Sequence, residues 1–231
     1  MNDAQVGGVA WRRRKEARAP EIMEAARRLI EEHGAAATSM ARIAQAAGVS
    51  EATVYKYFES KQDLVNQVLH EWATPFIDRL RSELEHVTGL QPRLTLIAIR
   101  FLRSLGETPK LHRVFFQELR WTDYRGTPLH KANQSFAGTV ITVVEDAIRG
   151  GEVRADVDPI MVRDMLFGGL EHIGMRTSFV GRDIDYESTA ARYVATVLNG
   201  IVTRSDGTSM PDELTRLSAL IDRLENAAPQ K

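Results

Sequence analysis

The sequence contains no cysteine, so a disulfide, a thiolate nucleophile and a zinc–thiolate site are all excluded. Its apolar stretches are broken by charged residues well short of the roughly 20 residues that a membrane-spanning helix needs. The start, MNDAQVGGVAWRRRK, places its positive charges after a weak apolar stretch, which is the reverse of a secretory signal peptide. We therefore expect a cytoplasmic protein with no membrane segment.

The patterns of common enzymes and metal sites are also missing. The chain has no phosphate-binding loop, no GxSxG motif and no histidine at motif spacing from a plausible nucleophile. Its histidines follow no metal-ligand spacing such as HExxH. The sequence therefore predicts a protein that is not an enzyme and that binds neither a metal nor a cofactor.

Strand patterns are almost absent, and apolar residues recur instead at spacings of three and four. In PEIMEAARRLIEEHG, for example, Ile22, Ala26 and Ile30 share one helical face. Pro20 suits the first turn of this helix, and Gly34 suits its end. The sequence therefore predicts an all-α fold.

Breaks in this periodicity divide the chain into helices. Three short helices come first, followed by one at about 61–86 that Pro75 should kink or split. Longer helices are predicted at about 91–105, 109–122, 128–149, 159–180, 185–203 and 211–227. We expect a flexible basic arm at 1–19, a helix-turn-helix domain at 20–66 and a helical bundle at 67–227.

The arm differs in charge from the rest of the chain. In WRRRKEAR, residues 11–18, five residues are basic and one is acidic, whereas the whole chain has a net charge of −1. This asymmetry indicates an anion-binding end. The alternative is a solvated, disordered terminus.

A helix of barely two turns is predicted within GVSEATVYKYFESKQDL, residues 48–64. So short a helix buries too little surface to be stable alone. The residues spaced to face inward, and to join it to the preceding helix across a glycine turn, are Ala44, Val49, Val54 and Phe58. Its outward face is then available for the major groove of DNA, which admits one α-helix.

Residues 38–69, TSMARIAQAAGVSEATVYKYFESKQDLVNQVL, resemble the DNA-binding domain of TetR-family transcriptional regulators. With the preceding helix the resemblance covers about residues 20–70, and the signature IA-x-x-AGVS-x-x-T-[VL]-Y-x-YF-x-[SN]K-x-x-L is nearly unbroken. Beyond residue 70 only the length, the helical layout and GEVRADVDP before a long helix are similar. The resemblance implies a homodimeric, ligand-responsive repressor of a palindromic double-stranded DNA operator.

The resemblance also implies roles for individual residues. The residues expected to contact phosphates, in some cases base edges, are Thr38, Ser39, Thr53, Tyr55, Tyr57 and Lys61. The residues expected to read the base sequence are Ser50, Glu51, Ala52 and Lys56. The residues that would reach the minor groove or flanking phosphates from the arm are Arg12, Arg13 and Arg14.

Glu51 is open to two interpretations. A carboxylate is repelled by phosphate but accepts a hydrogen bond from cytosine N4. The simpler alternative is that a glutamate in the first turn of a helix interacts favourably with the helix dipole.

The bundle is implied to dimerise and to hold a small-molecule effector. Glycines within MVRDMLFGGLEHIGMRTSFV cost roughly 1 kcal/mol each relative to alanine, which is tolerated where another helix or a ligand comes close. The predicted dimer interface is Gly168, Gly169, Gly174, Tyr193 and Val197, with internal packing as the alternative. The candidate ligand-binding residues, which would otherwise be ordinary core, are His112, Phe115, Phe116, Trp121, Phe136, Phe167 and His172.

The function expected from these features is a DNA-binding repressor that an effector releases from its operator by shifting the spacing of the two DNA-binding domains. The helix around Pro75 would link effector to DNA. An alternative is a helical protein-interaction module that keeps a helix-turn-helix without DNA readout. The tyrosines and Lys61 favour DNA, because a surface for protein contacts alone would not need them at those positions.

Overall fold

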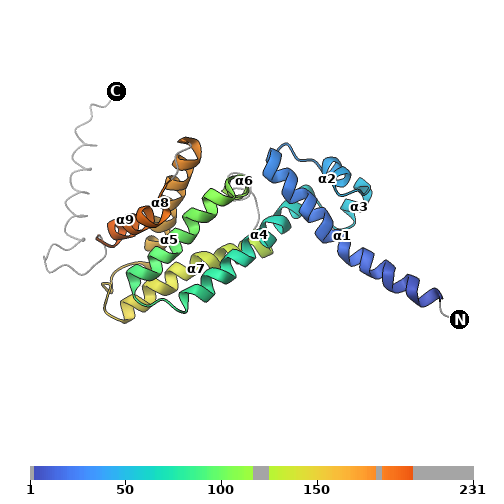
Figure 1. The fold of residues 1–231 in the computed structure, drawn as a ribbon. Helices are drawn as coiled ribbons and strands as arrows, with labels where there is room; N and C mark the ends of the chain where they lie inside the picture. Colours follow the sequence, from blue (N-terminus) through green and yellow to red (C-terminus); the bar gives the residue numbers. More distant parts are fainter. Residues whose placement is uncertain (1–2, 117–124, 181–183, 200–231) are drawn as a thin grey trace, which may run out of the picture.

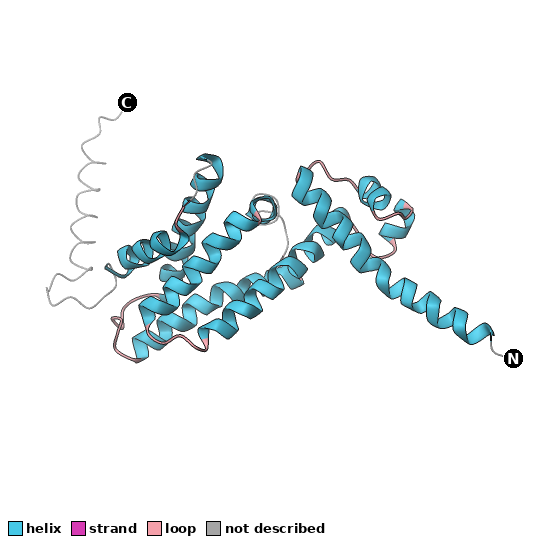
Figure 2. Ribbon diagram, in the orientation of Figure 1, coloured by secondary structure: helices cyan, strands magenta, loops and turns pink. Residues whose placement is uncertain are grey.

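The computed structural model describes residues 3–116, 125–180 and 184–199, and regular secondary structure in these ranges is helical. Figure 2 shows helices joined by short loops throughout the described chain. Figure 1 shows three helices at one end of the molecule, a larger helical group at the other, and α4 running between them. Among the described residues, no helix combines the length and the apolar character needed to cross a membrane.

The first group, which we call the head, consists of α1–α3 and the start of α4. Its helices are α1 (Asp3–His33), α2 (Met40–Ala46), α3 (Glu51–Tyr55) and α4 (Lys61–Leu84). They enclose one core, which includes Ile22, Ile30, Ile43, Val54, Phe58, Leu64 and Leu69, all at most 1% exposed. The predicted inward positions of Ala44, Val54 and Phe58 are confirmed, and Val49 is half-buried against the same core.

Serine caps start three helices of the head. The hydroxyl oxygens of Ser39, Ser50 and Ser60 accept hydrogen bonds from the N–H three residues later, at 3.2, 3.2 and 3.0 Å. The carboxylate of Asp63 reaches back beyond the cap and accepts from the N–H of Glu59, the residue before Ser60, at 3.0 Å. These bonds define where each helix begins.

The second group, which we call the bundle, consists of the later part of α4 together with α5–α9. Its further helices are α5 (Leu90–Glu107), α6 (Pro109–Val114), α7 (Pro128–Arg149), α8 (Pro159–Val180) and α9 (Tyr186–Asn199). Their core includes Leu94, Ile97, Leu102, Val140, Leu166, Leu170 and Val194. Two nitrogens of Arg100 on α5 donate to Glu83 on α4, at 2.6 and 2.8 Å, which joins neighbouring helices at the bundle surface.

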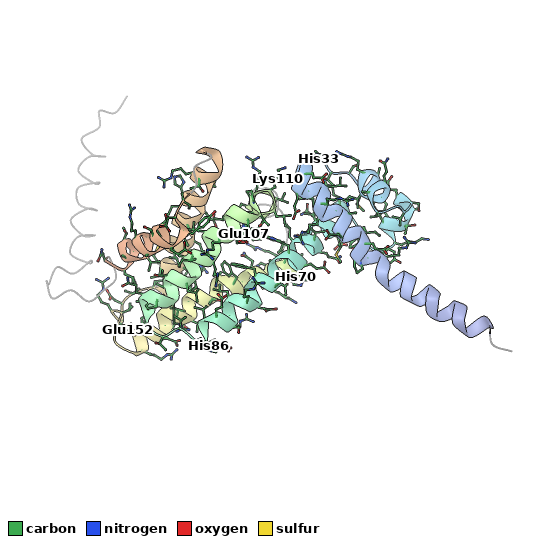
Figure 3. The ribbon with its side chains drawn as sticks, viewed as in Figure 1. His33, His70, His86, Glu107, Lys110 and Glu152 are labelled. Carbon is green, nitrogen blue, oxygen red and sulfur yellow. The ribbon has the colours of Figure 1, made fainter. Side chains whose placement is uncertain are left out.

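Three helices, α4, α6 and α7, contribute to the head core as well as to the bundle, and α7 does so through Leu129. On α4, Leu69 lies in the head core and Ile77 in the bundle core. Leu111 and Val114 of α6 also lie in the head core. The ammonium group of Lys110 donates to the carbonyl oxygen of Glu32 at 2.8 Å, and Figure 3 shows Lys110 beside the end of α1 that carries His33. Movement of α4 or α6 therefore acts on both groups.

The structure corrects the prediction for both helix-internal prolines. Pro20 lies inside α1, which begins at Asp3, so the arm predicted at 1–19 is helical from there and continues away from the head (Figure 1). Of the kink or split predicted at Pro75, the split does not occur, because α4 is one helix from Lys61 to Leu84. Both prolines are exposed, so the carbonyl that each leaves without its usual N–H partner can be hydrated. The helix predicted at 211–227 lies outside the described residues.

Candidate DNA-binding surface and effector pocket

The outward face of α3 is polar and aromatic. Val54 is fully buried beneath it, whereas the Tyr55 side chain is 51% exposed. The predicted contact residues at the surface of α3 are Glu51, Ala52, Tyr55 and Lys56, which are exposed, and Thr53 and Tyr57, which are half-buried. A short helix anchored by Val54 and Phe58 therefore presents one polar face to solvent.

Two hydroxyl groups at the start of α3 bind each other. The Oγ of Ser50 and the Oγ1 of Thr53 lie 2.8 Å apart, and the Ser50 oxygen also caps the helix. Whichever hydroxyl donates in this pair, the other keeps its own hydrogen for a further acceptor. Ser50 thus combines a structural role with one that allows a DNA contact. Glu51 lies in the first turn, where both of its interpretations stay open.

Thr38 is not placed as predicted. Its side chain is 1% exposed, its hydroxyl donates to the carbonyl of Gly34 at 2.9 Å, and its N–H donates to Ala35 at 3.2 Å. The prediction that Thr38 contacts phosphate is therefore wrong, because both of its donors close the turn after α1. Ser39, the next residue, is exposed at the start of α2.

Two basic residues lie on the helices that precede and follow α3 in the chain. Lys61 starts α4 and is half-buried. Arg42, which the sequence analysis missed, is exposed on α2 and donates to the carbonyl of Ala37 at 2.8 Å. In the sequence, the position of Arg42 three residues after the capping Ser39 could have indicated that it lies near the DNA-binding surface. The side chains of Arg12, Arg13 and Arg14 lie outside the described part of the structure, although their backbone is in α1.

A cavity of about 490 Å³ lies within the bundle between α4, α5, α6, α7 and α8. Aromatic rings form its walls: the ring centroids of Phe136 lie 4.9 Å from Phe167, 5.5 Å from Phe76 and 6.0 Å from Phe101. Polar and charged lining residues come mainly from α7 and α8, namely His130, Asn133, Gln134, Arg163, Asp164 and Glu171. Its volume and mixed lining are those of a site for a small organic molecule.

His112 lies at the buried end of the cavity. It is 7% exposed, its Nε2 lies 2.9 Å from the Oγ of Ser104, and its ring meets Trp72 edge-on with centroids 4.7 Å apart. Burial lowers the pKa of His112 to about 4, against a smaller opposing effect of its hydrogen bond to the Ser104 backbone. The imidazole is therefore uncharged at neutral pH.

The cavity includes most of the predicted ligand-binding residues. Those that line it are His112, Phe115, Phe116, Phe136 and Phe167. His172 does not, because it is exposed on α8, and Trp121 lies outside the described residues. The sequence analysis missed Trp72 and Phe76, which are four residues apart on α4 and so share a helical face.

The predicted dimer residues divide into internal and external ones. A Cβ at Gly169 would collide with Tyr193, and one at Gly174 would collide with Leu105. The Tyr193 hydroxyl donates to the Met165 carbonyl, and Val197 is 5% exposed. For Gly169, Gly174 and Val197 the structure thus corrects the prediction, since these residues serve packing inside the bundle.

Gly168 is the exception, because it is exposed and a Cβ there would meet nothing within 4 Å. It belongs to an exposed row at helical spacing that we call the α8 stripe: Met161, Met165, Gly168, His172 and Met175. The three methionines are 58%, 46% and 45% exposed. Apolar exposure of this kind, concentrated on one face, indicates an interaction surface.

Comparison with known proteins agrees with this architecture. The profile of the family described as "Bacterial regulatory proteins, tetR family" matches residues 22–68, and that of "YsiA-like protein, C-terminal region" matches residues 69–202. The chain is 25% identical to the fatty acid metabolism regulator protein of Bacillus subtilis, over 74% of this chain and 87% of the relative. It is also 25% identical to the HTH-type transcriptional repressor KstR2 of Rhodococcus jostii, over 82% of this chain and 93% of the relative.

Among solved structures, the fold is similar to that of the transcriptional regulator FadR from Bacillus subtilis in complex with stearoyl-CoA. The TM-score is 0.68 at 22% sequence identity, and the match covers 78% of this chain and 98% of the other. At this identity the likeness shows the shared fold.

Proposed function

The chain belongs to the TetR family of bacterial regulatory proteins, and we propose that its head binds the operator, its cavity holds the effector and its α8 stripe joins two copies. It is a ligand-responsive, DNA-binding transcriptional repressor that acts as a homodimer, and it is not an enzyme. Because its target is bacterial DNA, its place of action is the cytoplasm. Its proposed parts are an arm at 1–19, a helix-turn-helix DNA-binding domain at 20–66 and a ligand-binding and dimerisation region at 67–227.

The DNA contacts follow from the exposed face of α3. Its tyrosine, hydroxyl and lysine groups match the acceptors and donors of phosphates and major-groove base edges. The proposed contacts are Ser39, Ser50, Glu51, Ala52, Thr53, Tyr55, Lys56, Tyr57 and Lys61, with Arg12, Arg13 and Arg14 reaching the minor groove or flanking phosphates. Lys56 is the proposed base reader and Lys61 the phosphate clamp.

The homodimer is proposed to form through the α8 stripe. Gly168 leaves room for close approach, and Met161, Met165 and Met175 supply apolar surface on either side of it. A second copy related by two-fold symmetry would present the same stripe. Two heads placed about one DNA turn apart, roughly 34–36 Å, would then read a near-palindromic operator.

The effector is proposed to be a largely apolar molecule. The aromatic walls of the cavity support this, and one relative is named as a regulator of fatty acid metabolism. A structural neighbour was solved with stearoyl-CoA, and another is called a ketosteroid regulator. Long acyl chains and steroid-like rings share the apolar bulk that such a cavity takes.

Release from DNA is proposed to proceed through α4 and α6. Trp72 and Phe76 of α4, and His112 of α6, line the cavity. The same helices contribute to the head core. An effector that binds better to one arrangement of these helices shifts the population of head positions, and thereby changes the affinity for the operator.

The observation that carries this function is the exposed polar face of α3 over a buried Val54. This face belongs to a head whose core includes residues of helices that also line the aromatic cavity. The test is footprinting of the purified protein on its own upstream intergenic DNA at several salt concentrations. We expect protection of a palindrome, with an affinity that falls as salt rises. Absence of DNA binding at low salt would instead favour the protein-interaction module.

A further inference from the structure

We propose that the buried end of the cavity recognises an uncharged oxygen, a ketone or a hydroxyl, on the apolar skeleton of the effector. His112 and Ser104 would form this recognition point and determine which apolar molecules act as effectors. The inference rests on the proposed effector site and adds to it a specific chemistry, because a plain hydrocarbon skeleton offers nothing to these two residues.

The first argument is a count of hydrogen-bond donors. Nε2 of His112 lies 2.9 Å from the Oγ of Ser104, and the ring N–H also donates to the backbone of Ser104. When that N–H is on Nε2, the nitrogen cannot accept from the Ser104 hydroxyl, and the hydroxyl keeps its own hydrogen. Apart from Ser104, the His112 ring has no hydrogen-bond partner among the described residues. In this tautomer the pair therefore keeps one donor, the Ser104 hydroxyl, for an acceptor in the cavity.

The second argument is the apolar surroundings of the pair. The rings of Trp72, Phe116 and Phe101 lie 4.7, 5.7 and 6.2 Å from that of His112. An effector that fills this end displaces water, and a donor left without an acceptor in such surroundings lowers affinity. A saturated chain or ring placed there leaves the donor unsatisfied, whereas one oxygen satisfies it.

The third argument concerns charge. Burial keeps His112 neutral, so an anionic group gains no ion pair at this end of the cavity. In the described lining of the cavity, the guanidinium group is that of Arg163 on α8. It forms an ion pair with Asp164 at 2.7 Å, and the side chain of Asp164 is 60% exposed. A carboxylate or thioester head group fits the exposed α8 side better. The neutral oxygen fits the His112 side.

The position of His112 also links recognition to the head. Its neighbour Leu111 and nearby Val114 pack into the head core, and Lys110 bonds to the end of α1. An oxygen bound at His112 is therefore held by a helix that contacts the DNA-binding group directly. Specificity at this point is expected to appear in operator release as well as in binding.

The test uses matched ligands that differ by one oxygen, with binding measured by calorimetry on the full-length protein. The chain pairs are stearic acid with its 10-oxo derivative and stearic acid with its 10-hydroxy derivative. The ring pair is 5β-cholanic acid and its 3-oxo derivative. We expect at least one oxygenated ligand to bind about 10-fold or more tightly than its parent. Preference within a chain pair identifies a fatty-acid-type effector, and preference within the ring pair identifies a steroid-type effector.

Two variants locate the effect. His112→Phe keeps a ring of similar size and Ser104→Ala removes only the hydroxyl, and either is expected to reduce the preference to about 1–3-fold by lowering affinity for the oxygenated ligand alone. Circular dichroism and operator binding check that each variant is folded, and Ser104→Ala suffices if His112→Phe does not fold. A preference that survives in both folded variants overturns the assignment to this pair.

The remaining outcomes separate the inference from its premise. If the parents bind as tightly as the oxygenated ligands and release the operator, the proposed function stands and the inference is overturned. If none of the five ligands binds while the operator does, the apolar effector site itself is refuted, and the inference with it. If the wild-type protein did not bind the operator, that result would count against the DNA-binding role alone.

Discussion

The head and the bundle are both helical groups around an apolar core, yet they differ in how completely that core is filled. In the head, Val54, Phe58 and Leu64 are at most 1% exposed, and the one polar face lies outside. In the bundle, Phe101, Phe136 and Phe167 surround about 490 Å³ of space. A filled core holds a small recognition helix rigidly, and an incompletely filled one leaves room for a ligand.

The largest expected effect comes from truncating an aromatic ring in each region. Phe58→Ala should lower the free energy of unfolding by about 3–5 kcal/mol, because it opens a cavity in a filled core. Phe167→Ala should lower it by only about 1–2 kcal/mol, because that ring already borders open space. Urea unfolding followed by circular dichroism measures both. Equal losses would contradict the contrast between the two cores.

The second prediction concerns acid sensitivity of the bundle. The pKa of His112 is lowered from 6.5 to about 4, so the unfolded chain binds the proton more readily than the folded one between these values. The contribution of His112 to the free energy of unfolding is complete above pH 6.5. It decreases by about 3 kcal/mol as the pH falls toward 4. His112→Phe should remove that part of the pH dependence. Unfolding curves of the wild-type protein and of His112→Phe between pH 4 and 7 test this pH dependence. Parallel pH profiles for the two proteins would refute the prediction.

The third prediction tests the α8 stripe. Met165→Asp places a charge on a surface proposed to be buried between two copies, and should raise the dimer dissociation constant about 10- to 100-fold. Ser82→Asp, on an exposed position of α4, is the matched control and should leave the dimer intact. Analytical ultracentrifugation measures both. A stable Met165→Asp dimer would place the interface elsewhere.

The fourth prediction separates two kinds of DNA contact in the head. Lys61→Ala should weaken binding to all sequences about 10-fold and reduce the salt slope by about 1, as expected for a phosphate contact. Lys56→Ala should instead change which operator is preferred. Competition assays with operator variants at several salt concentrations distinguish these effects. A uniform loss of affinity for Lys56→Ala would show that it is not a base reader.

The smallest expected effect concerns the bond between the two regions. Lys110→Met removes the donor to the Glu32 carbonyl but keeps an apolar chain of similar length. Its stability should change by less than about 1 kcal/mol, and effector-free operator affinity should stay the same. Operator release should require more effector. Lys131→Met, exposed on α7, is the control. Identical release curves for both variants would exclude Lys110 from the coupling.

Helix starts in the head were predictable because each depends on neighbours in sequence. Ser39, Ser50 and Ser60 cap the N–H groups three residues later, and Gly48 adopts a φ of +65° at the turn. Thr38 was misjudged although its partner is also local, because a threonine before a helix can either face outward or turn back, and here its hydroxyl donates to the carbonyl of Gly34 four residues earlier. Local rules thus located the caps and the turn but did not decide between two local conformations of Thr38.

In the bundle, the same rules identified helices but not what they enclose. Gly169 and Gly174 are explained by Tyr193 and Leu105, which approach them from α9 and α5. Trp72 was not singled out, since its role depends on its position opposite His112. No periodicity within one helix specifies which rings of five different helices will meet.

The sequence by itself determined the all-α class, the helix-turn-helix and its outward residues, because caps, turn glycines and apolar spacing act over a few residues. Tertiary structure alone decided the passage of α1 and α4 through their prolines, the cavity and the neutral His112 at its buried end. The physical reason is that burial, and the pKa and cavity that follow from it, arise from packing between helices that are distant in sequence.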